Sequence, residues 1–142
     1  MKQLILGVIL LFPTVGLAQE VRNEKGICYR TIAGLGTYQA PADTATILIQ
    51  CFDAALAQCA LEDTFTDCLE ASTGSFMAAL EIGRNSFDQS TLQTALPGRR
   101  YAWIDFETSF RDLQQMDVPD ADAQVAKFRA LFFSMMKLNE LR

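Results

Sequence analysis

The stretch "CFDAALAQCALEDTFTDC", residues 51–68, holds three of the chain's four cysteines, and the fourth is Cys28. The chain of 142 residues contains no histidine, which is the usual partner of a catalytic cysteine. Zinc sites built from cysteines usually contain a close Cys-x-x-Cys pair, and no two cysteines of this chain are that close. We therefore expect the four sulfurs to form two structural disulfides.

The first twenty residues, MKQLILGVILLFPTVGLAQE, predict export. The stretch contains, in this order, a basic residue, an apolar run over residues 4–12, a proline and the small residues Gly16 and Ala18. This is the order found in a secretory signal peptide. We expect a signal peptide over residues 1–18 and a single helical domain over residues 19–142. The apolar run is half the length of a membrane-spanning helix of about 20 residues, so we expect no membrane anchor after cleavage; an uncleaved anchor is the alternative. A periplasmic or secreted protein meets an oxidising space, in which disulfides persist.

Apolar residues recur at the spacing of an amphipathic helix from Asp43, a common N-cap residue type, to Cys59. A second helix is predicted from Phe65 to about Phe87, with Gly74 as a weak point at which it bends or divides. The first stripe consists of Leu48, Cys51, Phe52, Ala55, Leu56 and Cys59, and the second of Phe65, Cys68, Leu69, Ser72, Phe76, Ala79, Leu80, Gly83 and Phe87.

Two further helices are predicted after Pro97 and Gly98, which mark a boundary. The first has Trp103, Phe106, Phe110 and Leu113 at helical spacing, and Val118-Pro119-Asp120 ends it and offers a cap to the next. The last helix is apolar on more than one side, through Val125, Phe128, Leu131, Phe132, Phe133, Met135, Met136 and Leu138. Such a helix is central to a bundle or partly exposed for a partner, and we favour core packing. With no strand pattern or internal repeat, the sequence predicts an all-α fold: a small bundle of four to five helices stapled by two disulfides. The first of these helices, around Cys28, is expected to be short, because Gly34 and Gly36 close it.

Helix geometry restricts the cysteine pairing. In one continuous helix, Cys51 and Cys59 lie about 12 Å apart along the axis, at about 1.5 Å per residue. A disulfide needs Cα atoms within about 7 Å, so this pair is excluded, together with the pairing of Cys28 to Cys68 that it would require. Two connectivities remain, and we prefer the more local one, Cys28 with Cys51 and Cys59 with Cys68.

Removal of the signal peptide leaves 11 basic and 17 acidic residues, a net charge of −6. An acidic protein disfavours nucleic acid and anionic membranes as partners and favours a basic protein. The alternative is that the charge only keeps an exported protein soluble.

The cysteine spacing and two segments, "CLEASTGSFMAALEIGRNSF" at residues 68–87 and "RRYAWIDFETSF" at residues 99–110, resemble the LprI-like lysozyme-inhibitor domain. The resemblance covers residues 28–112. The matching positions are Cys28, Cys51, Cys59, Cys68, Leu69, Phe76, Arg100, Trp103 and Phe106. The chain departs from the family pattern at Glu81-Ile82, Arg99 and Glu107, and it lacks the family's later cysteines.

The resemblance implies an exported helical protein of the bacterial cell envelope that acts by protein binding, with a basic lysozyme as the partner. Acidic residues outside the helical stripes are the candidate partner-binding residues: Glu62, Asp63, Asp67 and Glu70, with Asp53 nearby. The alternative is that these carboxylates are solvated helix faces and caps. We expect no bound cofactor and no metal site.

Two other functional classes compete with protein binding. An enzyme would have to use carboxylates such as Asp105 and Glu107 beside Trp103, but residues i and i+2 of a helix point about 200° apart, so we expect no enzyme. The other alternative is an envelope structural or complex-assembly protein that docks a partner through its apolar C-terminal helix, with the cluster Phe132, Phe133, Met135 and Met136. The basic pair Arg99 and Arg100 is assigned no role.

Overall fold

The computed structural model describes residues 25–38 and 42–142. The predicted signal peptide lies outside these ranges. Residues 25–33 are helical and are followed by a turn. Five helices follow: α2 (Thr44–Cys59), α3 (Phe65–Asn85), α4 (Ser90–Gln93), α5 (Pro97–Gln115) and α6 (Ala121–Glu140). The predicted all-α fold is confirmed, since the described residues contain no strand, and the helix that the sequence did not indicate is the single turn α4.

The helix boundaries follow from residues at the helix ends. Pro97 occupies the first turn of α5, where its missing N–H has no partner to lose. The Asp120 carboxylate accepts a hydrogen bond from the Ala123 amide at 2.8 Å and so caps α6. Asp43 precedes α2 as predicted, but its side chain makes no capping hydrogen bond.

Gly74 neither bends nor divides α3, which continues for 21 residues. A glycine inside a helix costs only about 1 kcal/mol relative to alanine. Leu69, Ala79 and Leu80, on both sides of Gly74, are each fully buried, and their burial outweighs that cost.

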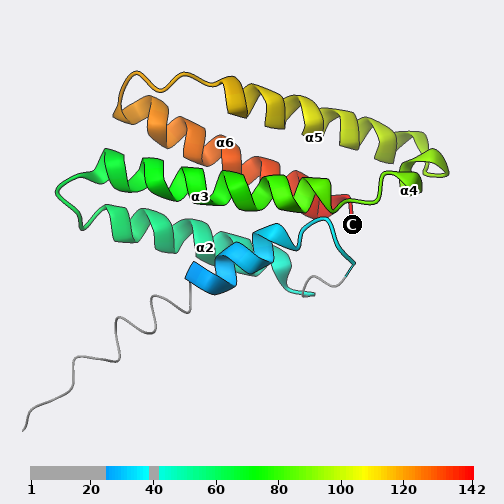
Figure 1. Cartoon of the computed structure of the whole chain (residues 1–142), viewed down its shortest axis with the longest axis horizontal. Helices are drawn as coiled ribbons and strands as arrows, with labels where there is room; N and C mark the ends of the chain where they lie inside the picture. The colour runs from blue at the N-terminus through cyan, green and yellow to red at the C-terminus, as the bar shows by residue number, and fades with distance from the viewer. Residues whose placement is uncertain (1–24, 39–41) are drawn as a thin grey trace, which may run out of the picture.

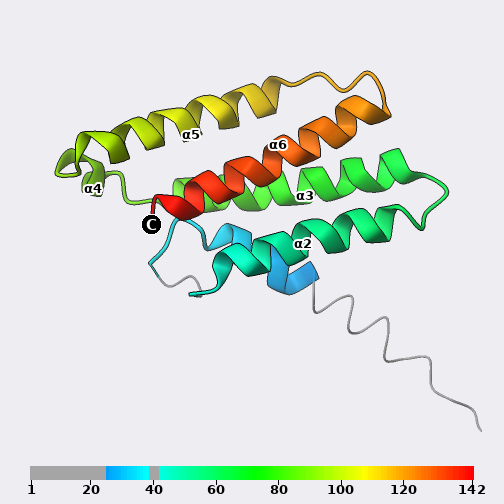
Figure 2. The same cartoon turned by 180° about the vertical axis from the view of Figure 1, so that it is seen from behind.

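The four long helices run antiparallel to their chain neighbours, with α2 and α5 on the outside of the bundle (Figure 1). From behind, α3 and α6 again lie between them (Figure 2). Helix α6 packs against α2, α3 and α5, which confirms the prediction that the most apolar helix is central. Its Phe128, Leu131 and Leu138 side chains are fully buried, together with Phe106 and Leu113 of α5.

The apolar cluster of α6 is mostly internal. Met135 is buried, and Phe132 and Met136 are half-buried and pack against the core. The Phe132 ring contacts that of Phe52 in α2 at 4.9 Å between centroids. Phe133 is the exposed member of the cluster, at 57%.

The disulfides join Cys28 to Cys51 and Cys59 to Cys68, with Cα atoms 5.6 and 5.4 Å apart. This is the preferred pairing from the sequence. The first bridge attaches the helical residues 25–33 to α2, and the second ties the end of α2 to the first turn of α3. Two structural disulfides indicate an oxidising compartment. Within the described ranges, no helix is both long and apolar enough to cross a membrane.

Candidate functional site: the acidic end of the bundle

The family-motif residues are mainly core residues. Leu69 and Phe106 are fully buried, and Trp103 is 8% exposed and stacks on Phe87 at 4.5 Å between ring centroids. Phe76 is half-buried and stacks on Phe128 of α6 at 6.0 Å. The motif positions therefore hold the bundle together, and Arg100 is the exposed position among the non-cysteine members of the motif.

The four candidate partner-binding carboxylates are all exposed and lie together. Glu62 and Asp63 are in the connection between α2 and α3, and Asp67 and Glu70 are in the first two turns of α3. The disulfide between Cys59 and Cys68 fixes this connection at both of its ends. The predicted residues are thus all exposed and lie within residues 62–70, at the start of α3.

The same end of the bundle contains four more carboxylates that sequence reasoning did not single out. The α2–α3 and α5–α6 connections lie at one end of the molecule in both views (Figures 1 and 2). The α5–α6 region has four aspartates and no lysine or arginine within residues 112–122, a signal visible in the sequence. We call this surface the acidic end and define it by Glu62, Asp63, Asp67, Glu70, Asp112, Asp117, Asp120 and Asp122, all exposed.

Helix stability explains only part of this charge. Acidic residues near the amino-terminal ends of α3 and α6 interact favourably with the helix dipole, as Asp67 and Asp122 do. Glu62 and Asp63 follow the carboxyl end of α2, and Asp112 and Asp117 flank that of α5, where the dipole favours cations. Neither helix has a basic residue in its last turn. Glu62, Asp63 and Asp117 also precede the amino-terminal ends of α3 and α6, where the dipole favours anions, so Asp112, in the last turn of α5, is the carboxylate that helix stability does not explain.

An open groove of about 600 Å³ adjoins the acidic end. It runs between α3, the α5–α6 connection and the first turns of α6, and Glu70 and Asp120 belong to its lining. Lys127 also lines it, and its ammonium donates to the Met116 carbonyl oxygen at 3.0 Å, which holds the end of α5 to α6.

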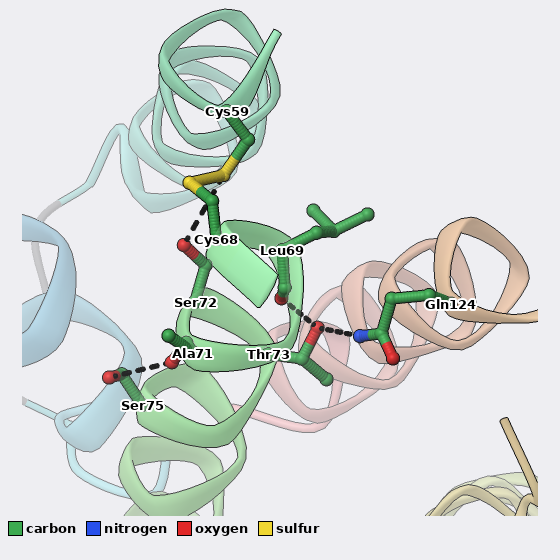
Figure 3. The surroundings of a disulfide bond; sticks show 8 residues. All are labelled: Cys59, Cys68, Leu69, Ala71, Ser72, Thr73, Ser75 and Gln124. Carbon is green, nitrogen blue, oxygen red and sulfur yellow. Dashed lines mark hydrogen bonds between the residues drawn. A yellow bond between two sulfur atoms is a disulfide. The ribbon is translucent and has the colours of Figure 1, made fainter. Parts of the chain in front are cut away.

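A polar pair lies beneath the groove (Figure 3). The Thr73 hydroxyl donates to the Leu69 carbonyl oxygen at 2.7 Å, and the Gln124 side-chain amide donates to the Thr73 hydroxyl oxygen at 3.0 Å. Thr73 and Gln124 are 4% and 2% exposed, and both line the groove. No local pattern in the sequence indicated this pair, because its members are 51 residues apart.

The carboxylates considered for catalysis are engaged elsewhere. Glu107 binds Arg84 of α3 through two hydrogen bonds, at 2.6 and 2.7 Å, and this contact raises the pKa of the Arg84 guanidinium. Asp105 pairs with Lys137 of α6 at 2.7 Å. Each carboxylate thus joins α5 to a different helix, and in the described part of the chain no group of three or more Cys, Asp or Glu residues is placed to hold a metal ion.

Arg99 packs against the end of the chain. Its guanidinium donates to the Leu141 carbonyl oxygen, so it links the start of α5 to the end of α6. Glu107, on the same helix, pairs with Arg84 of α3. The basic pair therefore has one member with a structural contact and one, Arg100, that is exposed.

Comparison with protein-family models, with curated proteins and with solved structures finds no match to this chain.

Proposed function

We propose that this chain is an exported, periplasmic or secreted protein of the bacterial cell envelope that acts by binding a basic protein through the acidic end, not by catalysis. A basic lysozyme is the first candidate partner, because the sequence resembles lysozyme inhibitors. The observation that carries the proposal is the concentration of eight exposed carboxylates at one end of the bundle. Such a surface attracts a basic partner and speeds its encounter.

The position of the charge favours binding over solubility alone. A negative charge that served only solubility would not need to gather at one end. At the opposite end, where α3 ends and α5 begins, exposed carboxylates such as Asp88 are mixed with exposed cations such as Arg100. The charge asymmetry would orient a basic partner toward the acidic end.

The alternative is docking through α6. A monomer with the α6 cluster exposed would favour that role, but Met135 is buried and Phe132 and Met136 are half-buried. Phe133 alone offers little apolar area to a partner. The acidic end is therefore the better candidate surface.

The proposal is tested by titrating the oxidised protein, residues 19–142, into lysozymes that lyse bacterial cell walls, at low and moderate salt. We expect dose-dependent inhibition that weakens as salt screens the charges. Absence of inhibition and of binding for every lysozyme tested would contradict the lysozyme proposal.

Charge reversal locates the surface. Glu62→Lys with Asp63→Lys changes two residues of the α2–α3 connection and should weaken inhibition at low salt by about tenfold or more. The matched control is Glu81→Lys with Glu140→Lys, which changes the net charge equally at exposed positions away from the acidic end. Equal losses in the two variants would point to net charge rather than to a defined surface.

A further inference from the structure

The groove beside the acidic end contains a helix glycine that packing within this chain does not require. A Cβ atom built on Gly74 would meet nothing within 4 Å, although glycine is among the poorest residues for a helix interior. By contrast, a Cβ on Gly83 of the same helix would stand 2.8 Å from the Ile32 carbonyl oxygen. Gly74 lines the groove and leaves the α3 backbone there uncovered for a close approach.

The floor of the groove contains an acceptor without a donor. The hydrogen of the Thr73 hydroxyl is used on the Leu69 carbonyl oxygen, so the hydroxyl can only accept from Gln124. The Gln124 amide nitrogen must therefore face Thr73, and its carbonyl oxygen faces away from it, as Figure 3 shows. Among the described residues no donor bonds to that oxygen. The residue as a whole is 98% buried, but the oxygen does not count among the fully buried atoms that lack a partner, so a ligand in the groove can reach it.

The charged groups that line the groove, two carboxylates and one ammonium group, favour a cation with several donors. The exposed carboxylates, Glu70 and Asp120, and the Gln124 oxygen are acceptors, while the Lys127 ammonium donates to a backbone carbonyl. An arginine guanidinium presents five N–H donors in a plane and is less strongly hydrated than a lysine ammonium, so it suits a partly apolar groove. Met77, Val118 and Pro119 supply apolar contact for its methylene stem.

We propose that this groove is the socket for an arginine side chain presented by the basic partner, with the Gln124 carbonyl oxygen as the acceptor at its floor and Glu70 at its rim. The inference rests on the proposed function, whose partner it describes more closely. The groove volume of about 600 Å³ is larger than any single side chain, so it also takes the residues that flank the arginine. The acidic end attracts the partner, and the socket fixes its position.

Filling the groove tests the socket. Gly74→Met projects a side chain into open space and should weaken binding to an inhibited lysozyme by about tenfold or more. Gly98→Met is the matched control, because Gly98 also lies in a helix, its Cβ would also meet nothing within 4 Å, and it lies at the start of α5, at the other end of the bundle. It should bind within about twofold of the wild type.

The second variant removes the Gln124 side-chain carbonyl oxygen, the acceptor at the floor of the groove. Gln124→Met keeps the length of the side chain and leaves the Thr73 hydroxyl on the Leu69 carbonyl oxygen, and it should weaken binding by about tenfold. Thermal unfolding by circular dichroism identifies any part of this loss that comes from misfolding. A folded Gln124→Met protein with unchanged affinity would overturn the role of this oxygen.

A peptide probe separates the socket from the identity of the partner. The probe is acetyl-Gly-Arg-Gly-amide, titrated at millimolar concentration into the ¹⁵N-labelled protein. It should shift the NMR signals of the Gly74 backbone amide and the Gln124 side-chain amide saturably. The shifts should be larger than those caused by the matched lysine peptide, acetyl-Gly-Lys-Gly-amide. Gly74→Met should abolish these shifts. Binding of the arginine peptide without binding of any lysozyme would leave the socket standing and reject the lysozyme partner. Lysozyme binding that Gly74→Met does not change, or equal shifts from both peptides, would overturn the socket and leave the proposed function in place.

Discussion

Gly36 lies directly against the backbone of Gly83: a Cβ atom on Gly36 would stand 1.8 Å from the Gly83 carbonyl oxygen and 2.6 Å from the Phe87 amide nitrogen. The turn after the helical residues 25–33 thus packs on the end of α3 without any intervening side chain. Ile32 and Leu35, beside this contact, are fully buried. The amino-terminal segment is therefore held to the bundle by backbone proximity as well as by the Cys28–Cys51 disulfide.

Gly36→Ala should destabilise the protein by about 2 to 3 kcal/mol, because the methyl group displaces backbone atoms that cannot rotate away. Urea denaturation of the oxidised protein measures the effect. Gly26→Ala is the control, since its Cβ meets nothing within 4 Å, and it should change stability by no more than about 1 kcal/mol. Equal midpoints of urea denaturation for Gly36→Ala and Gly26→Ala would mean that the turn does not pack on α3 as described.

Gly74→Ala should stabilise the protein by about 1 kcal/mol, because alanine is the better helix residue and its methyl group enters open space. The midpoint of urea denaturation should rise with an unchanged dependence on urea. Destabilisation would show that the groove beside Gly74 is closed in solution.

The sequence predicted the helices and disulfides well for physical reasons. Helical periodicity is local and strong in α2, α3, α5 and α6, and Pro97 and Asp120 mark boundaries through their own backbone chemistry. The length of α2 then excluded a disulfide between Cys51 and Cys59, which narrowed the pairing.

The groove and its floor could not be predicted in the same way. Thr73 and Gln124 are 51 residues apart, and each looks like a surface residue in its own helix until the helices pack. Half of the acidic end could be predicted, because Glu62 and Asp63 stood out next to a disulfide. That the α5–α6 connection lies at the same end of the bundle depends on how the helices pack. The single turn α4 has only four residues, of which Leu92 is buried, and this is too few for a periodic signal.

Glu107→Gln should lower the free energy of unfolding by about 1 to 2 kcal/mol. The Glu107 carboxylate binds Arg84 through two charge-assisted hydrogen bonds that join α5 to α3, and both side chains are less than one third exposed. The neutral amide retains the shape but loses the charge, and the Arg84 guanidinium, 5.5 Å from the Phe110 ring centroid, loses its counter-ion. Thermal and urea unfolding measure the change.

Asp105→Asn is the control for this pair. Asp105 binds Lys137 at a similar distance, but its side chain is 65% exposed, and surface pairs contribute about 0 to 1 kcal/mol. A loss from Asp105→Asn as large as that from Glu107→Gln would show that burial does not distinguish the two ion pairs.

Asp88 should titrate below the ordinary range of aspartate. Hydrogen bonds from the Ser90 hydroxyl and backbone amide lower the pKa of its carboxyl group, and the amide lies 2.9 Å from Oδ1. Because the folded-state pKa is depressed, the contribution to stability is present above the unfolded pKa and is lost as the pH falls through the folded value. An NMR titration of the Asp88 side chain checks this, and Ser90→Pro, which removes the amide hydrogen and the hydroxyl, should bring the pKa back up. An ordinary pKa in the wild type would contradict the contact.

The disulfide pairing can be read directly from fragments of the unreduced protein. Cleavage after Lys and Arg and before Asp places each cysteine in its own fragment: residues 26–30, 43–52, 53–62 and 67–84. We expect mass spectrometry to find 26–30 joined to 43–52 and 53–62 joined to 67–84, because the corresponding Cα atoms lie 5.6 and 5.4 Å apart.

The same bridges set an expectation for stability. By loop-closure entropy, each disulfide contributes about 3 kcal/mol, slightly more for the loop of 23 residues than for that of 9. Replacing Cys28 and Cys51 by alanine should therefore cost at least as much stability as replacing Cys59 and Cys68, although the second pair includes the fully buried Cys59.

The disulfide between Cys59 and Cys68 has an additional role, since it fixes the α2–α3 connection with Glu62 and Asp63. Its removal should weaken partner binding beyond the effect on folding, while removal of the first pair should leave the affinity of the folded protein unchanged. Loss of affinity from the first pair alone would place the binding surface on the amino-terminal helical segment instead of the acidic end.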